Sequence, residues 1–331
     1  SIGQPAVTDY PGPGAGLVTV TIDPGMSVSE IGVLLAQDGV VKTRQAFVDA
    51  ASANPKARTI AAGTYSLLHE MKAADAVTYL VGPAHRLSLH VVIPEGFQDD
   101  QVLQAIAKTG HITQGDLQSA ARNTKALHLP TYSGGKLEGF LFPATYDWEP
   151  GTTAQQALSS MVERFNQEAT DIDLVGNAAQ LKMSPYDIVK IASIVEREGK
   201  TPDDYGKIAR VIYNRIAKGM PLQMDSTLQY TKAVRTAHLS LQDLSDPSPY
   251  NSYTHKGLPP TPIANPGRAS LLAALNPEPG NWLYFIAFPD GTTKFTADYN
   301  QFLALKAASE SAKPSASVKP SSAAPSASTS K

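Results

Sequence analysis

The segment Ser184–Gly199, which reads SPYDIVKIASIVEREG, has the pattern of an amphipathic helix that ends in two acidic residues. Ser184 is a favourable N-cap, and the proline after it suits the first helical position. Apolar residues then recur at intervals of three and four, which places them on one face: Ile188, Ile191, Ala192 and Val195. Gly199 favours the end of the helix after Glu198. We therefore predict a helix over 185–198 with one face packed into a core.

The two acids of this helix, Glu196 and Glu198, are expected to lie in different surroundings. Helical geometry places Glu198 on the apolar side, with Ile194 and Val195 as its neighbours one turn earlier. Apolar neighbours and the negative end of the helix dipole both disfavour a charged carboxylate and so raise its pKa. A general acid needs such a carboxyl group. The same pattern also fits two solvated glutamates at a helix end.

Length and composition exclude several classes of protein. The chain has 331 residues with 28 Lys and Arg, 30 Asp and Glu and no cysteine, and its length suggests two or three domains. The net charge of −2 argues against nucleic-acid binding. A sequence without cysteine has no disulfide, zinc thiolate or cysteine nucleophile. The scattered histidines and missing phosphate-binding motifs predict no metal and no other cofactor.

The first part of the chain contains a repeat. Ile22–Gly25 matches Ile93–Gly96, 71 residues later, and the apolar positions that follow also correspond. Each copy predicts a strand, a glycine turn, a helix ended by Gly39 or Gly110, and a second helix. This order resembles a LysM-like glycan-binding module, although no closing strand is evident within each copy. A duplicated packing unit without a binding role is the alternative.

Composition divides the chain further. The Pro- and Gly-rich residues 1–16 are typical of a linker, and the duplicated region occupies 17–125. The turn-rich residues 126–136 suggest a boundary before a second domain over 137–306. Residues 307–331, rich in Ala, Ser and Pro, are predicted to be a disordered tail. We predict an α+β protein, with LysM-like strand and helix modules followed by a mixed, helix-rich domain.

The second domain contains a series of short motifs. They are LEGFLFPATY at 137–146, IASIVERE at 191–198, VIYNR at 211–215, LQMDS at 222–226, YNSY at 250–253, GLPP at 257–260, PIANPG at 262–267 and LYFIA at 283–287. Their order and spacing resemble those of the YceG-like endolytic murein transglycosylases (MltG), from about residue 17 to 306. Gly199 and Met224 depart from the residues common in that family.

The resemblance implies that Glu198 is the catalytic acid/base of a peptidoglycan lytic transglycosylase. Glu198 then protonates the oxygen between N-acetylmuramic acid and N-acetylglucosamine. The resulting carboxylate takes a proton from the 6-hydroxyl of the muramic acid, which closes a 1,6-anhydro ring. One carboxylate suffices because the nucleophile belongs to the substrate, whereas an ordinary glycosidase uses two. A non-catalytic peptidoglycan-binding scaffold and a lysozyme-like hydrolase are the alternatives.

Six residues are candidates for substrate contact: Asn214, Gln223, Asp225, Tyr250, Asn251 and Tyr253. The loop Tyr250–Tyr253 offers aromatic faces and amide groups to a sugar, or else is a packed loop fixed by nearby prolines. Asn214 has a structural hydrogen bond as its alternative. Asp225 either caps a helix over 226–233 or belongs to the site. Asp225 and Glu138 are the candidates for a second carboxylate, and Glu138 alternatively braces its own loop.

The resemblance also implies partners and a location. The partners are peptidoglycan glycan strands and cell-wall synthases, with no nucleic acid. Relatives are held in the cell membrane by a single N-terminal helix, so this chain is expected on the outer face of the membrane. No apolar run in the sequence approaches the ~18–20 residues that cross a bilayer. The membrane contact is therefore expected through a helix upstream of this chain.

Overall fold

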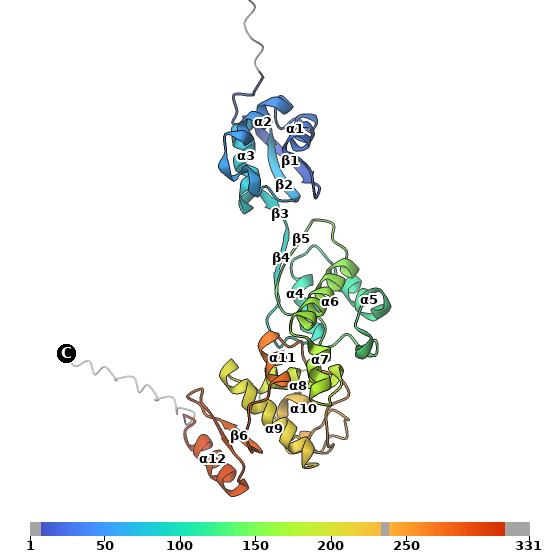
Figure 1. Ribbon diagram of the computed structural model, residues 1–331, viewed down its shortest axis with the longest axis vertical. Helices are drawn as coiled ribbons and strands as arrows, with labels where there is room; N and C mark the ends of the chain where they lie inside the picture. Colours follow the sequence, from blue (N-terminus) through green and yellow to red (C-terminus); the bar gives the residue numbers. More distant parts are fainter. Residues whose placement is uncertain (1–7, 233–237, 315–331) are drawn as a thin grey trace, which may run out of the picture. The chain divides into compact units, whose positions relative to one another are not determined.

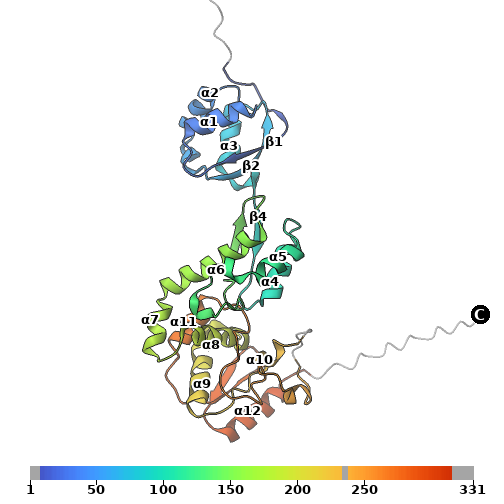
Figure 2. The same ribbon diagram turned by 90° about the vertical axis from the view of Figure 1, so that its right-hand side faces the viewer.

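The computed structural model describes residues 8–232 and 238–314, which form two compact units of mixed α and β structure (Figures 1 and 2). The first unit contains the described residues through Pro94, together with 100–128 and 143–163. The second contains 95–99, 129–142 and the described residues from Arg164 onward. The α+β class agrees with the prediction. No helix in the described ranges is both long and apolar enough to span a membrane.

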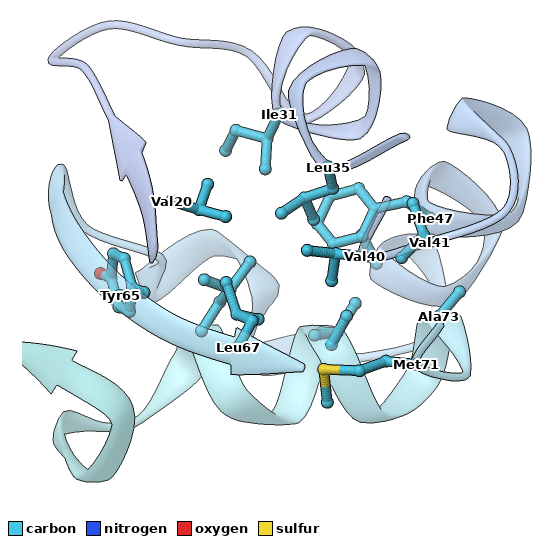
Figure 3. Close-up of a cluster of buried hydrophobic side chains, with 14 of the residues drawn as sticks. Val20, Ile31, Leu35, Val40, Val41, Phe47, Tyr65, Leu67, Met71 and Ala73 are labelled. Carbon is cyan, nitrogen blue, oxygen red and sulfur yellow. The ribbon is translucent and has the colours of Figure 1, made fainter. Parts of the chain in front are cut away.

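The first half of the first unit is a three-stranded antiparallel sheet covered by helices. Its elements are β1 (Ala15–Ile22), α1 (Val28–Gln37), α2 (Arg44–Ser52), η1 (Pro55–Thr59), β2 (Gly63–His69), α3 (Ala73–Val81), η2 (Pro83–His85) and β3 (Arg86–Leu87), with strand order β1-β2-β3. Val20 and Ile22 are buried on β1 while Thr21 between them is exposed, as a half-buried strand requires. Figure 3 shows Leu35 and Phe47 from the helices directed toward the Val20 side of the sheet.

The second half of this unit repeats the order of the first. Its elements are β4 (Leu89–Val92), α4 (Asp99–Ala107), α5 (Gln114–Arg122), η3 (Thr124–Ala126) and β5 (Thr145–Trp148). The predicted strand-helix-helix order is present in both copies. Each copy is also closed by an antiparallel strand, β2 in the first and β5 in the second. Because β5 belongs to the first unit, a single boundary at 126–136 does not describe the division of the chain.

The second unit is built around α8, the helix predicted from the opening motif. Its helices are η4 (Thr131–Ser133), α6 (Ala154–Asp171), α7 (Leu174–Gln180), α8 (Pro185–Glu198), η5 (Pro202–Asp204), α9 (Tyr205–Ala217), α10 (Asp225–Gln229), η6 (Asp243–Ser245) and α11 (Arg268–Leu275), with α6 belonging to this unit from Arg164 onward. Ser184 accepts a hydrogen bond from the Asp187 amide at 3.0 Å, and the predicted apolar face is buried. The predicted range and cap of α8 are therefore confirmed.

The unit ends in an antiparallel hairpin and a helix. These elements are β6 (Tyr284–Ala287), β7 (Thr293–Thr296) and α12 (Tyr299–Ser311), and α12 lies beside β6 in Figure 1. The prediction of a disordered tail from 307 onward is wrong for 307–311, which are helical. Residues 315–331 of that predicted tail lie outside the described residues, as do 1–7 of the predicted linker.

Candidate active site

Glu198 is the last residue of α8, and its carboxylate is held by the start of α10. The Oε1 atom accepts hydrogen bonds from the Ser226 hydroxyl at 2.7 Å and from the Ser226 amide at 3.2 Å. Burial raises the pKa of Glu198 above its ordinary value, and the Asp225 charge adds to the rise, while the two Ser226 bonds and Lys200 oppose it. The net shift is upward. Glu198 thus keeps its proton to a higher pH than an exposed glutamate does, as a general acid requires.

Glu196, two residues earlier, has a structural position. Its Oε1 accepts hydrogen bonds from the Gly267 amide at 2.8 Å and the Ser270 hydroxyl at 3.1 Å, and its Oε2 accepts one from Tyr205 at 2.6 Å. Gly267 is the N-cap of α11 and has no side chain to cap that helix. Glu196 takes over this capping role from a neighbouring helix. The two acids of α8 therefore serve different parts of the unit.

Glu198 opens into a cleft of about 430 Å³, a size typical of small-ligand sites. The cleft is lined by residues of α8, α9, α10, β6, α12 and the loops between them. Among the predicted contact residues, Gln223, Asp225 and Tyr253 lie in this lining together with Glu198. In the described ranges no group of three or more His, Asp or Glu side chains is arranged to hold a metal ion.

Asp225 lines the cleft and does not cap a helix. The N-cap of α10 is Met224, and Asp225 is the first helical residue. Its carboxylate accepts a hydrogen bond from the Tyr253 hydroxyl. The interpretation of Asp225 as a helix cap is therefore wrong. The helix α10 ends at Gln229, and the predicted end at 233 lies outside the described residues. Gln223, just before α10, has a left-handed backbone with φ of 54° and an exposed side chain.

Three predicted contact residues lie outside the cleft lining. Asn251 is fully buried, and its side-chain amide group donates to the carbonyls of Leu244 and Asp246, so it fixes the loop and is not available to a sugar. Asn214 donates to two backbone carbonyls at Gly280 and Trp282, which is the structural alternative. The third is Tyr250. Its hydroxyl oxygen lies 2.8 Å from the Thr261 hydroxyl oxygen, at hydrogen-bonding distance, and its ring packs against Tyr230 with the ring centres 5.0 Å apart.

Glu138 braces its own loop. It accepts hydrogen bonds from the Tyr230 hydroxyl at 3.0 Å and from the Asp99 amide at 3.1 Å. Burial and the Asp99 charge raise its pKa well above the ordinary value. Glu138 is not among the residues that line the cleft around Glu198. This arrangement matches its bracing alternative.

Two residues of the site were not singled out from the sequence. Ser226 binds the Glu198 carboxylate and is nearly buried, and its only sequence signal was its place in the LQMDS motif. Arg215 is 5% exposed, and its guanidinium donates to the carbonyls of Pro221 and Leu283, which ties α9 to the cleft loops. A buried arginine with backbone partners leaves no local pattern in a sequence.

The fold and the cleft define an α+β protein with a strand-helix-helix-strand repeat and a raised-pKa carboxyl group at a helix end. The profile of the YceG-like family matches residues 20–308. The chain is 32% identical over 296 residues to a Bacillus subtilis protein named endolytic murein transglycosylase, covering 84% of this chain and 81% of the relative. The chain therefore belongs to the YceG-like family.

Two further proteins are similar to this chain. A Streptococcus pneumoniae protein, also named endolytic murein transglycosylase, is 30% identical over 305 residues. The match covers 82% of this chain but 54% of that relative, so this chain spans about half the length of the Streptococcus protein. The crystal structure of a YceG-like protein from Listeria monocytogenes superimposes with a TM-score of 0.61 at 29% identity, covering 88% of this chain and 99% of that one.

Proposed function

We propose that this protein is an endolytic murein transglycosylase that cleaves peptidoglycan glycan strands with Glu198 as the acid/base. The observation that carries the proposal is the position of Glu198, a carboxyl group of raised pKa that opens into a cleft. The names of the curated relatives supply the substrate class. Tyr253 and Gln223 in the same lining offer an aromatic ring and an amide group to the sugars.

In the proposed reaction Glu198 gives its proton to the glycosidic oxygen as the bond to the muramic acid anomeric carbon breaks. The Glu198 carboxylate then takes the proton of the 6-hydroxyl of that same sugar, and this oxygen closes the 1,6-anhydro ring. No water is consumed, and Glu198 ends protonated for the next cycle. The Ser226 hydroxyl and amide hold Oε1 in place through both steps.

Asp225 supports a second candidate, a lysozyme-like hydrolase. A hydrolase uses two carboxylates, and Asp225 lies in the cleft lining close enough to Glu198 for its charge to raise the pKa of Glu198. The Tyr253 hydroxyl, however, already donates to the Asp225 carboxylate. A carboxylate committed in this way is better suited to positioning Tyr253 than to activating water. We therefore favour the transglycosylase.

The two reactions differ in their products. Digestion of purified glycan strands is expected to give fragments lighter by one water than those released by a hydrolytic muramidase, because the anhydro ring replaces the reducing end. Mass spectrometry of both digests in parallel is the measurement. Reducing ends from this protein would establish the hydrolase instead, and strand binding without any cleavage would establish the scaffold alternative.

Substitutions of two neighbours of Glu198 are expected to shift the pH profile of cleavage in opposite directions. Asp225→Asn removes a charge that raises the pKa of Glu198, and it keeps an oxygen that can accept from Tyr253. Cleavage needs protonated Glu198, so the alkaline limb of the kcat/KM profile should shift to lower pH. Ser226→Ala removes the hydroxyl hydrogen bond, which lowers the pKa of Glu198, keeps the bond from the backbone amide, and should shift the limb to higher pH. Shifts of the same sign in both variants would contradict this assignment.

We also propose that the β-α-α-β copies of the first unit are LysM-like modules that bind glycan. Their support is the element order and antiparallel closure of each copy. Because the proposed substrate is murein, we propose that the protein acts on the outer face of the cell membrane, beside the synthases that make the strands. The synthase partners and the upstream membrane helix expected from the family resemblance remain predictions.

A further inference from the structure

The cleft around Glu198 continues along one face of α12. Tyr299, Phe302, Leu303 and Lys306 all line it. They recur at intervals of three and four residues, so they share one side of the helix. Figure 1 shows α12 running beside β6, which supplies Tyr284 and further lining residues. The α12 face is thus part of the cleft that contains Glu198.

The α12 face presents aromatic and apolar surface to solvent. Tyr299 is 56% exposed and Leu303 is 44% exposed, although both are large apolar side chains. The rings behind them form a cluster in which Phe302 stacks on Tyr284 at 5.0 Å, and the Arg215 guanidinium lies 4.9 Å from the centre of the Tyr284 ring. Tyr284 is half-buried between Phe302 and Arg215, whereas Tyr299 is supported by the cluster and keeps most of its side chain exposed. Such a supported ring suits contact with the apolar face of a sugar.

Lys306 gives the same face an available positive charge. Among the described residues, two cationic side chains line the cleft, Arg215 and Lys306. Arg215 is 5% exposed and is already bonded to backbone carbonyls. Lys306 is exposed, and within 8–232 and 238–314 it forms no ion pair or side-chain hydrogen bond. A free cation beside an exposed aromatic ring fits a ligand that is part sugar and part carboxylate.

We infer that the α12 face binds the peptide stem of a murein strand, with a sugar against Tyr299 and a stem carboxylate at Lys306. The inference rests on the proposed function. Lys306 follows Tyr299 by seven positions, which is about 10 Å along a helix. An extended peptide covers that distance in about three residues. The lactyl carboxyl of muramic acid lies much closer to its own ring, and it is an uncharged amide wherever a stem is attached.

The variant Lys306→Glu, which reverses the charge, tests the inference. Strand binding is measured in proteins that also carry Glu198→Gln, so that the strands are not cleaved during the measurement. The matched control is Lys218→Glu, the same charge change at an exposed lysine outside the cleft lining. Each variant is titrated with strands that carry peptide stems, with strands stripped by an amidase, and with stem-bearing strands whose carboxylates have been amidated.

Lys306→Glu is expected to weaken binding of stem-bearing strands by roughly fivefold, because an attraction becomes a repulsion. Binding of amidated strands should stay unchanged, and Lys218→Glu should have no effect on any strand. Tyr299→Ala should weaken the binding of all three strands, because each contains the sugars.

Three results would overturn the stem assignment. The first is an equal loss of binding of amidated strands by Lys306→Glu. The second is a loss of binding confined to stripped strands, which would make the lactyl carboxylate the partner of Lys306. The third is that the protein binds none of the strands. Cleavage is assayed separately with Glu198 intact. A wild-type protein that binds stem-bearing strands in the expected way but releases no product would refute the proposed reaction and leave the binding result in place.

Discussion

Glu198→Gln is expected to lower the rate of strand cleavage by roughly 10³-fold, within the range attributed to general acid–base catalysis. Glutamine cannot supply a proton to the glycosidic oxygen or take one from the 6-hydroxyl. Its Oε1 can still accept both hydrogen bonds that Ser226 donates to Glu198, so the contact between α8 and α10 is kept. The measurement is the initial rate of soluble fragment release, with the unfolding midpoint recorded alongside it.

Glu196→Gln is the matched control, because it makes the same chemical change two residues away on the same helix. Its Oε1 can accept from Gly267 and Ser270, and its amide group can donate to the Tyr205 hydroxyl. Cleavage should stay within a few-fold of the wild-type rate. If Glu196→Gln abolished cleavage and Glu198→Gln did not, the assignment of the two helix faces would be reversed.

The sequence predicted α8 well because its signals are local. The Ser184 cap, the period of the apolar residues and Gly199 all act within one turn of the residues that they affect. The different surroundings of Glu196 and Glu198 also followed from helix geometry. The partners of these acids did not, because Ser226 and Gly267 are 28 and 71 residues distant from them.

Two of the predicted contact residues have surroundings that the neighbouring sequence did not indicate. Asn251 is polar and lies between two tyrosines, which is typical of a sugar-binding loop, yet its amide points inward to the carbonyls of Leu244 and Asp246. Asp225 has the residue type of an N-cap, but the helix begins one residue earlier than predicted, so Asp225 is its first helical residue and Met224 is the N-cap. The Asn251 side chain is fixed by backbone carbonyls, and the Asp225 carboxylate accepts from the Tyr253 hydroxyl, 28 residues away. Both sets of partners depend on the path of the loop over 244–253, which the local sequence does not specify.

The ends of elements were missed for a similar reason. The strand that closes the second repeat, β5, lies in the LEGFLFPATY motif and the residues after it, which were assigned to the other domain. Its pairing with β4 joins residues more than fifty positions apart. Residues 307–311 share the Ala- and Ser-rich composition of the tail, but they continue a helix that Asp298 caps. Alanine favours the helix once it has been nucleated.

Glu196→Ala is expected to destabilise the second unit by about 2–4 kcal/mol, because it leaves several buried donors without an acceptor. The Gly267 amide, the Ser270 hydroxyl and the Tyr205 hydroxyl all donate to Glu196. Ser270 is fully buried and Tyr205 is 7% exposed, so water cannot readily replace the lost carboxylate. The measurement is the free energy of unfolding in urea, followed by a probe in the second unit.

Three variants distinguish the stabilising effect of the hydrogen bonds that Glu196 accepts from the effect of its negative charge. Glu310→Ala removes an exposed acid from α12 and should change the free energy of unfolding by less than about 0.5 kcal/mol. Glu196→Gln keeps the acceptor for Gly267 and removes a charge that raises the pKa of neighbouring Glu95, so its cost should stay below about 1 kcal/mol. A Glu196→Ala variant as stable as Glu310→Ala would show that α11 needs no cap from α8. A Glu196→Gln variant as unstable as Glu196→Ala would mean that the negative charge itself, at the positive end of the α11 dipole, is the stabilising feature.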